Sequence, residues 1–270
     1  IEDSFLELVA IKKILDLSKS TNEYLKFLKK FSDYYPELYK KSTQIEFTPY
    51  ISKSIEEIVN KFGEIKDDAS PDLVNIRRSI NVVRGKINQS FGMALSHFNS
   101  LGYLDDIKET VVDNRRVLAV QAMYRKKVKG SILGNSKTGS IAYIEPETTL
   151  KYSRELNVLE FEEREEIMRI LRMLSATIRP YAPLISQYQE FLSDMDVIAA
   201  KAKYANRING ILPKINEEKR LFFREAFHPI LLLNNKAENK PTFPQTIELE
   251  STNRIIVISG PNAGGKTISL

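Results

Sequence analysis

The stretch IIVISGPNAGGKTISL, residues 255–270, joins an apolar run to a glycine-rich turn and completes the pattern G-x-x-x-x-G-K-[ST]. We expect residues 255–258 to form a buried strand and a helix to begin near Lys266, which is the arrangement of a phosphate-binding loop. The sequence therefore predicts binding of a nucleoside triphosphate. The residues expected to contact it are Gly260, Pro261, Asn262, Ala263, Gly264, Gly265, Lys266 and Thr267.

The residue types of this loop suit ATP and Mg²⁺. Successive backbone N–H groups in the turn form a nest for anions, and the helix N-terminus adds its positive dipole end. Lys266 is expected to reach the outer phosphates, and the Thr267 hydroxyl is expected to bind the metal. Hydrolysis also requires an acidic strand that holds the metal and orients water. No residue follows Leu270, so we expect this chain by itself to be inactive as an ATPase.

Composition excludes several other kinds of chemistry. The 270 residues, of which 42% are hydrophobic, allow one or two folded domains and include no cysteine. Thiolate metal sites, disulfides and cysteine nucleophiles are therefore excluded, and a reducing cytoplasmic setting is favoured. We find no apolar run long enough to span a membrane, and expect no membrane contact. His97, near a helix end, and His228, at a strand edge, are both interpreted as structural.

A basic stretch between residues 114 and 144 contains no Asp or Glu. Its cations are Arg115, Arg116, Arg125, Lys126, Lys127, Lys129 and Lys137. Since the formal net charge is +5, these seven cations leave the remaining residues at about −2. We expect this stretch to contact a polyanion, most simply DNA or RNA phosphates, without sequence specificity. Tyr124 and Tyr143 are candidates for stacking on bases. The alternative is that lysines protect exposed strand edges against aggregation.

The basic stretch lies between two long predicted helices. Ser70 caps the first, which runs to about residue 100 with Pro71 in its first turn. The second covers about residues 148–178, and its acidic run 160–166 is interpreted as a solvated face. Ion pairs within this helix are expected for Glu160–Arg164 and Glu165–Arg169. Further helices are expected within residues 4–62. Strands are expected within 111–120, at 128–133 and at 140–144. Pro180 and Pro183 are expected to end the second long helix, and another helix follows at 184–209.

Taken together, these residues resemble the MutS family of DNA mismatch-repair ATPases. The family's marks are residues 260–267, the His228-Pro229 pair and the helix containing 194–205. The marks of the second MutS subfamily, whose members generally carry no mismatch-reading domain, are residues 70–78, 116–129, 136–139 and 143–146. The chain departs from the family at Phe227, where an arginine is usual, and carries Thr267-Ile268 as the second subfamily does.

The resemblance implies a mainly α fold: long-helix levers, a helical core and a small β clamp, followed by the first strands of an α/β P-loop ATPase domain. The implied divisions are a helical core (1–64), a first lever helix (65–110), a basic clamp (111–149), a second lever helix returning to the core (150–212) and the start of the ATPase domain (213–270). It also implies a homodimer formed through the ATPase domains, in which nucleotide state moves the levers and clamps. Phe243 is the nearest match to the family residue that packs on adenine.

Three functions remain open from the sequence. The first is an ATP-driven DNA clamp that acts on branched or recombination-intermediate DNA and suppresses recombination, often with a nuclease domain absent from this chain. The second is an ATPase that grips collided ribosomes through ribosomal RNA. The third is a passive arm of a chromosome-organising (SMC-like) ATPase, which long uninterrupted heptads would support. Each long helix spans only about four heptads and the insert between them is β-rich, which disfavours this third function.

Overall fold

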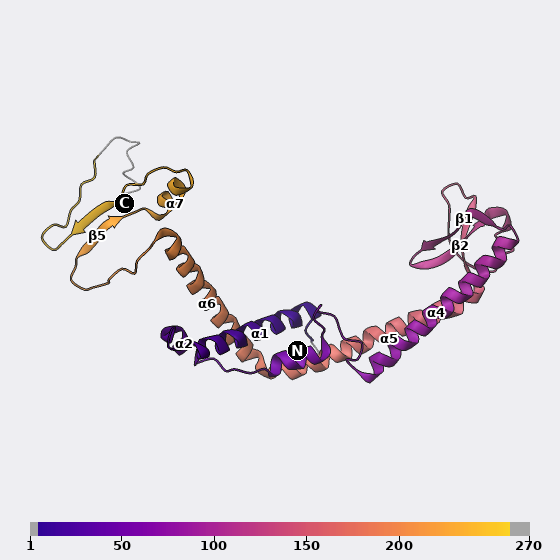
Figure 1. The fold of residues 1–270 in the computed structure, drawn as a ribbon. Coiled ribbons are helices and arrows are strands. Elements are labelled where there is room, and N and C mark those ends of the chain that lie inside the picture. The colour runs from indigo at the N-terminus through magenta and orange to yellow at the C-terminus, as the bar shows by residue number, and fades with distance from the viewer. Residues whose placement is uncertain (1–4, 260–270) are drawn as a thin grey trace. The chain divides into compact units, whose positions relative to one another are not determined.

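The computed structural model describes residues 5–259, and the chain divides into two compact units between Gln189 and Glu190 (Figure 1). The helices of the first unit are α1 (Leu8–Lys30), α2 (Pro36–Ser42), α3 (Tyr50–Ile58), α4 (Pro71–Ser100) and α5 (Glu147–Ile178). Its strands are β1 (Leu104–Val112), β2 (Arg115–Gln121), β3 (Gly130–Asn135) and β4 (Ile141–Pro146). Helix α6 (Ala182–Ile208) begins in the first unit and continues into the second. The mainly α fold with a small sheet is confirmed.

Helix α4 begins where the sequence predicts. The Ser70 hydroxyl accepts a hydrogen bond from the Leu73 N–H at 3.0 Å, and Pro71 occupies the first helical position. The 30 residues of α4 extend about 45 Å at ~1.5 Å per residue. Ile80, Val83 and Phe91 of its apolar stripe are buried. This stripe gives α4 the face along which α5 lies beside it (Figure 1).

The interpretation of the acidic run as a solvated face is wrong for its buried end. The Glu166 side chain is only 8% exposed; its carboxylate accepts hydrogen bonds from the Ser70 hydroxyl at 2.5 Å and from Arg169 at 2.6 Å. The two expected pairs within α5 are also not formed: Glu160 pairs with Arg84 of α4, and Arg169 pairs with Glu166. For Glu160 the reason is tertiary, because Arg84 of α4 lies opposite it. Arg169 instead pairs with Glu166 of its own helix, and its guanidinium group also lies 3.6 Å from Asp72 of α4.

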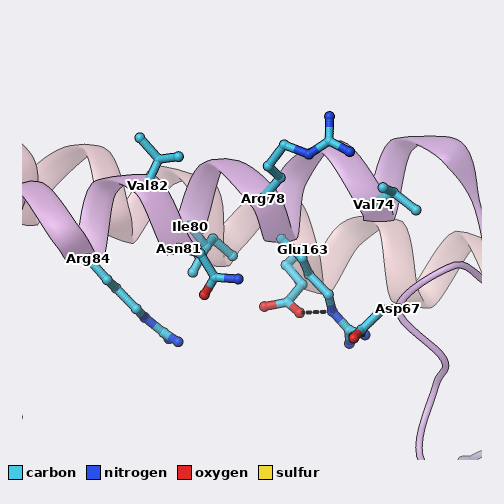
Figure 2. Close-up of a pocket in the computed structure, with 9 residues that line it drawn as sticks. Asp67, Val74, Arg78, Ile80, Asn81, Val82, Arg84 and Glu163 are labelled. Carbon is cyan, nitrogen blue, oxygen red and sulfur yellow. Dashed lines mark hydrogen bonds and ion pairs between the residues drawn. The ribbon is translucent and has the colours of Figure 1, made fainter.

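A second ion-pair group links α4 to α5 about two turns beyond Ser70 on α4. Arg77 Nε donates to Glu163 Oε1 at 2.7 Å, and the same guanidinium group pairs with Asp67. In Figure 2, Glu163 and Asp67 lie on one side of α4, whereas Arg78 points to the other. The arginine therefore joins three segments: the loop before α4, α4 itself and α5.

Two separate hydrophobic clusters lie at opposite ends of the α4–α5 pair. The first contains Ile11 of α1, Ile55 of α3, Leu73 of α4, Leu174 of α5 and Tyr188 of α6. The Tyr188 hydroxyl donates to the Glu46 carbonyl at 2.7 Å, and burial raises the pKa of this phenol. Helices α1, α3 and α6 thus share one core with the nearby ends of α4 and α5. We call α4, α5 and the four-stranded sheet the arm.

The second cluster joins the end of α4 to the sheet, whose strands have the order β1-β2-β4-β3 and are all antiparallel to their neighbours. Its members are Phe91, Ala94, Leu104, Leu118, Val120, Val128, Ala142 and Ile144. The expected strands are confirmed, although β1 begins seven residues before Val111. The connection from β2 to β3 starts near one end of β4, where the Ala122 N–H donates to the Ser140 carbonyl at 2.8 Å. It ends at the other end of β4, where Gly130 pairs with Pro146. We call residues 122–129 the crossover.

The second unit contains the remainder of α6, strand β5 (Leu221–Ala226), helix α7 (Pro229–Ala237) and strand β6 (Gln245–Leu249). β5 and β6 form a two-stranded antiparallel sheet. The expected strand at 255–258 is wrong, because Ile255 and Val257 are 84% and 85% exposed and neither β5 nor β6 pairs with this segment. A strand of that kind needs neighbours on both sides, and the described part of this unit supplies none. The break before α6 is a 3₁₀ turn at Arg179–Tyr181, and Pro183 lies within the first turn of α6 rather than breaking it.

Candidate nucleic-acid interface

The crossover displays most of the predicted cations. Its first residues form a 3₁₀ turn at Ala122–Tyr124, and its only buried residue, Val128, belongs to the cluster beneath the sheet. Arg125, Lys126, Lys127 and Lys129 are all exposed around this anchor. None of the four forms an ion pair within residues 5–259. Four positive charges without acidic partners are therefore available to an external anion.

Arg115 and Arg116, in contrast, are already paired inside the protein. Arg115 Nη1 lies 3.1 Å from Oε2 of Glu145, a carboxylate that is 2% exposed and also accepts from the Ser153 hydroxyl at 2.5 Å. Arg116 Nη2 lies 2.6 Å from Glu109 Oε2, and its guanidinium group stacks 4.3 Å from the Phe91 ring centroid. Arg116 thus links the sheet to α4, whereas Arg115 links β2 to Glu145 of β4, which Ser153 of α5 also contacts. A role for either in nucleic-acid binding remains a prediction.

Lys137 is not part of the crossover but lies three residues before Ser140, whose carbonyl accepts a hydrogen bond from Ala122, the first residue of the crossover. It is exposed in the β3–β4 turn, which Gly139 closes with a positive φ of 73°. The hydroxyl groups of Ser136, Thr138 and Ser140 hydrogen-bond to one another in this turn. Because β3 runs from Gly130 to Asn135, Lys129 and Lys137 flank opposite ends of one strand. Lys137 thus lies at the end of β3 opposite to that which follows Lys129.

Sequence reasoning missed an aromatic stack beside the crossover. Tyr103 and Tyr124 stack with ring centroids 4.6 Å apart at 19°, and Phe98 stacks on Tyr103 at 6.4 Å. The Lys127 ammonium lies 5.5 Å from both tyrosine centroids. Tyr124 was a candidate for stacking on bases, but its partner is a protein ring; Tyr143 pairs with no ring in the described part of the chain. Only the fold brings these rings together, because about twenty residues separate Tyr103 from Tyr124.

The predicted nucleotide-binding residues 260–267 lie outside the described residues, so the phosphate loop stays a prediction. Phe243 precedes β6 in a loop and is 81% exposed, which leaves its ring open to a ligand. His228 is not at a strand edge as expected. It caps α7, where Nδ1 accepts from the Leu231 N–H at 3.3 Å and Pro229 takes the first helical position. The His-Pro pair before an apolar run was the overlooked sign of a helix start.

Two further classes of site can be assessed within residues 5–259. No group of three or more His, Asp or Glu side chains there is placed to hold a metal ion. No helix within the same residues is both long and apolar enough to cross a membrane. The exposed cations are therefore the strongest candidate site among the described residues.

Comparison with known proteins gives consistent relatives, although no protein-family model matches the chain. Endonuclease MutS2 of Ligilactobacillus salivarius is 33% identical over 267 residues, which cover 98% of this chain and 33% of that protein. Endonuclease MutS2 of Streptococcus suis is 33% identical over 264 residues, or 98% of this chain and 32% of the relative. Endonuclease MutS2 of Halothermothrix orenii is 31% identical over 274 residues, which cover 97% of this chain and 34% of that protein. The chain spans about a third of the length of the curated relatives it matches.

Proposed function

Because the chain belongs to the MutS family, in its second subfamily, we propose that it forms part of an ATP-dependent clamp for branched or recombination-intermediate DNA. In this role the protein suppresses recombination by acting on the joined strands. Nuclease activity, which the names of the relatives carry, would be supplied by residues outside this chain. The division into core, levers, clamp and ATPase start is part of the same proposal.

The observation that carries the proposal is the set of exposed, unpaired cations on the crossover. Protection of strand edges does not explain them, because the edge strands are β1 and β3, whereas Arg125, Lys126 and Lys127 lie in a connection that crosses the sheet. Edge strand β1 carries its own charged residues, Asp105, Asp106, Lys108 and Glu109. Phosphate contact uses exposed ammonium and guanidinium groups without requiring base-reading geometry.

The nucleotide part of the proposal rests on the chemistry of the donor set at residues 260–267. Glycine N–H groups and the Lys266 ammonium would bind the triphosphate, and the Thr267 hydroxyl would bind Mg²⁺. The exposed Phe243 ring is proposed to cover the adenine. Bound ATP supplies the free energy that changes the clamp between states, and a second copy of the protein completes each site.

Binding by the full-length protein tests this function. A labelled four-way junction, a duplex of the same length and ribosomes are titrated with and without ATP. Replacing Arg125, Lys126, Lys127 and Lys129 with glutamine should weaken junction binding at least tenfold, and should lower the salt slope by about 3–4, since each phosphate contact contributes ~0.9. A control variant loses four exposed lysines of the helical core, Lys13, Lys29, Lys40 and Lys53, and should bind normally.

Equal losses in the two variants would overturn the assignment of the clamp. The second candidate function is gripping of collided ribosomes, and the same exposed cations favour it because ribosomal RNA presents the same phosphates. Ribosome binding tighter than junction binding, lost in the crossover variant, would select that function instead.

A further inference from the structure

A groove at the junction of α4, α5 and the crossover has a lining that the proposed clamp contacts do not account for. Its volume is about 840 Å³. Lys127 and Lys129 enter it from the crossover, Lys86 from α4 and Lys151 from α5. Between these lysines lie the apolar side chains of Met93, Ala94 and Phe98, together with His97 and Tyr152. Three segments that are distant in sequence therefore bring four ammonium groups to one hollow.

The charged side chains of this groove are almost all positive. Glu147 is the only acidic residue that lines it, and none of the four lysines pairs with an acid in the described part of the chain. Lys86 and Lys151 instead lie near the Tyr152 ring, with ammonium-to-centroid distances of 5.9 Å and 4.6 Å. Like charges gathered in a concave site repel one another, and a bound polyanion removes that repulsion.

A second groove of the same arm shows the opposite arrangement. It is lined by Arg84, Arg115 and Arg116, but these cations pair with Glu160, Glu145 and Glu109. Its positive charge is therefore neutralised by the protein itself. Of these two grooves, the one with the four lysines combines unpaired cations with an apolar floor.

We propose that this lysine groove binds a single-stranded segment of nucleic acid, with phosphates on the lysines and a base or sugar on the Met93–Phe98 floor. The inference rests on the proposed function and deepens it by assigning the strand-binding site. A volume of about 840 Å³ is that of a ligand pocket, so the groove admits a flexible strand of a few nucleotides, while a duplex touches only its rim. Sites for single strands usually combine cationic side chains that contact the phosphate backbone with aromatic or apolar surface that contacts the bases.

The test uses the full-length protein and two fluorescein-labelled probes, oligothymidylate and oligouridylate of equal length. One variant removes three groove lysines, Lys86→Gln, Lys129→Gln and Lys151→Gln. The matched variant removes three exposed cations of α4, β1 and α5 that lie outside both the groove and the predicted clamp contacts, Arg78→Gln, Lys108→Gln and Arg154→Gln. Anisotropy titrations across a range of salt concentrations should show at least a tenfold loss for the groove variant. Its salt slope should fall by about 2, because each single-strand phosphate contact contributes ~0.7. The matched variant should change less than about threefold, because its three cations make none of the proposed phosphate contacts.

Each outcome decides the matter. Equal losses in the two variants would overturn the groove while leaving the clamp function standing, whereas failure of the unsubstituted protein to bind any nucleic acid would overturn both. A preference for one probe that the groove variant loses supports the groove and identifies DNA or RNA as its natural strand.

A second measurement keeps the proposal testable if the triple variant is unstable. Met93 is 61% exposed in the groove, and the chain contains no tryptophan. Met93→Trp should add fluorescence that is quenched when a base stacks on it, whereas Val111→Trp, on the β1 edge strand, should not be quenched. An unquenched tryptophan at Met93 with a saturating strand would overturn the proposal.

Discussion

Glu166 shows how a single buried carboxylate fastens the base of the arm. Its strongest contact is the hydrogen bond from Arg169, which lowers the pKa of the carboxyl group, and the Ser70 hydroxyl adds to the same shift against the effect of burial. A carboxylate with a depressed pKa stabilises the fold above its unfolded pKa. That stability is lost as pH falls through the folded pKa.

Glu166→Gln should therefore reduce the free energy of unfolding by about 1.5–3 kcal/mol at neutral pH, the range for hydrogen bonds to charged groups. The difference from the unsubstituted protein should shrink as pH falls below the ordinary carboxyl value of 4.5, because protonation then removes the charge of Glu166 that the glutamine variant already lacks. Urea unfolding followed by circular dichroism at several pH values measures it. Glu162→Gln, an exposed site on the same helix, is the control. A difference that does not depend on pH would contradict this account.

Gly130 is fixed by a close approach between strands. A Cβ at this position would lie 2.1 Å from the Glu145 carbonyl oxygen and 2.8 Å from Ile144 Cγ2. Gly130→Ala should destabilise the sheet by about 1–3 kcal/mol, the usual range for overpacking. Gly134→Ala in the same strand should be nearly neutral, because its Cβ would meet only the Tyr143 ring at 3.6 Å. Thermal unfolding of the two variants, compared side by side, checks the contrast; equal melting temperatures would refute it.

Among the elements, α4 contains a glycine that nothing in its surroundings requires. Gly85 lies inside the helix, and no atom lies within 4 Å of the position that its Cβ would take. Gly85→Ala should raise stability by about 0.5–1 kcal/mol, since alanine loses less backbone entropy in a helix. Gly102→Ala, just after α4, should lower it instead, because φ there is 70°. Denaturant midpoints show whether each substitution raises or lowers stability. A lower midpoint for Gly85→Ala would show that Gly85 is required for packing.

An element could be predicted from the sequence where neighbouring residues alone determine it. The start of α4 is determined by two adjacent residues, Ser70 and Pro71, so the sequence alone located it. The burial of Glu166 depends on α4 lying opposite α5, and no pattern within residues 160–166 reveals it. The strand expected at 255–258 failed for the same reason, since a strand exists only with partners. The lysine groove was not predicted, because Lys86 and Lys151 lie outside the acid-free stretch from which the clamp was predicted.

At the scale of the whole molecule, the first unit has two cores joined by one helix pair. Leu118→Ala, in the core beneath the sheet, should speed hydrogen exchange in β1–β4 and leave α1 and α3 protected. Leu174→Ala, in the helical core, should do the reverse. Each substitution removes a fully buried leucine and should cost about 2–5 kcal/mol. Hydrogen exchange measured by mass spectrometry resolves the two patterns, and equal acceleration in both regions would show a single cooperative core.

The path of the crossover limits how many residues this connection can lose. It must travel the length of β4, six residues or about 20 Å. From Ala122 to Gly130 the chain can reach only about 23 Å, because its first residues are coiled in a 3₁₀ turn that rises ~2 Å per residue. The connection is therefore nearly taut, and deleting two residues would pull β3 out of register. Insertions and deletions among relatives should accordingly collect in the short bend around Gly139, while the connection that bears the cations keeps its length.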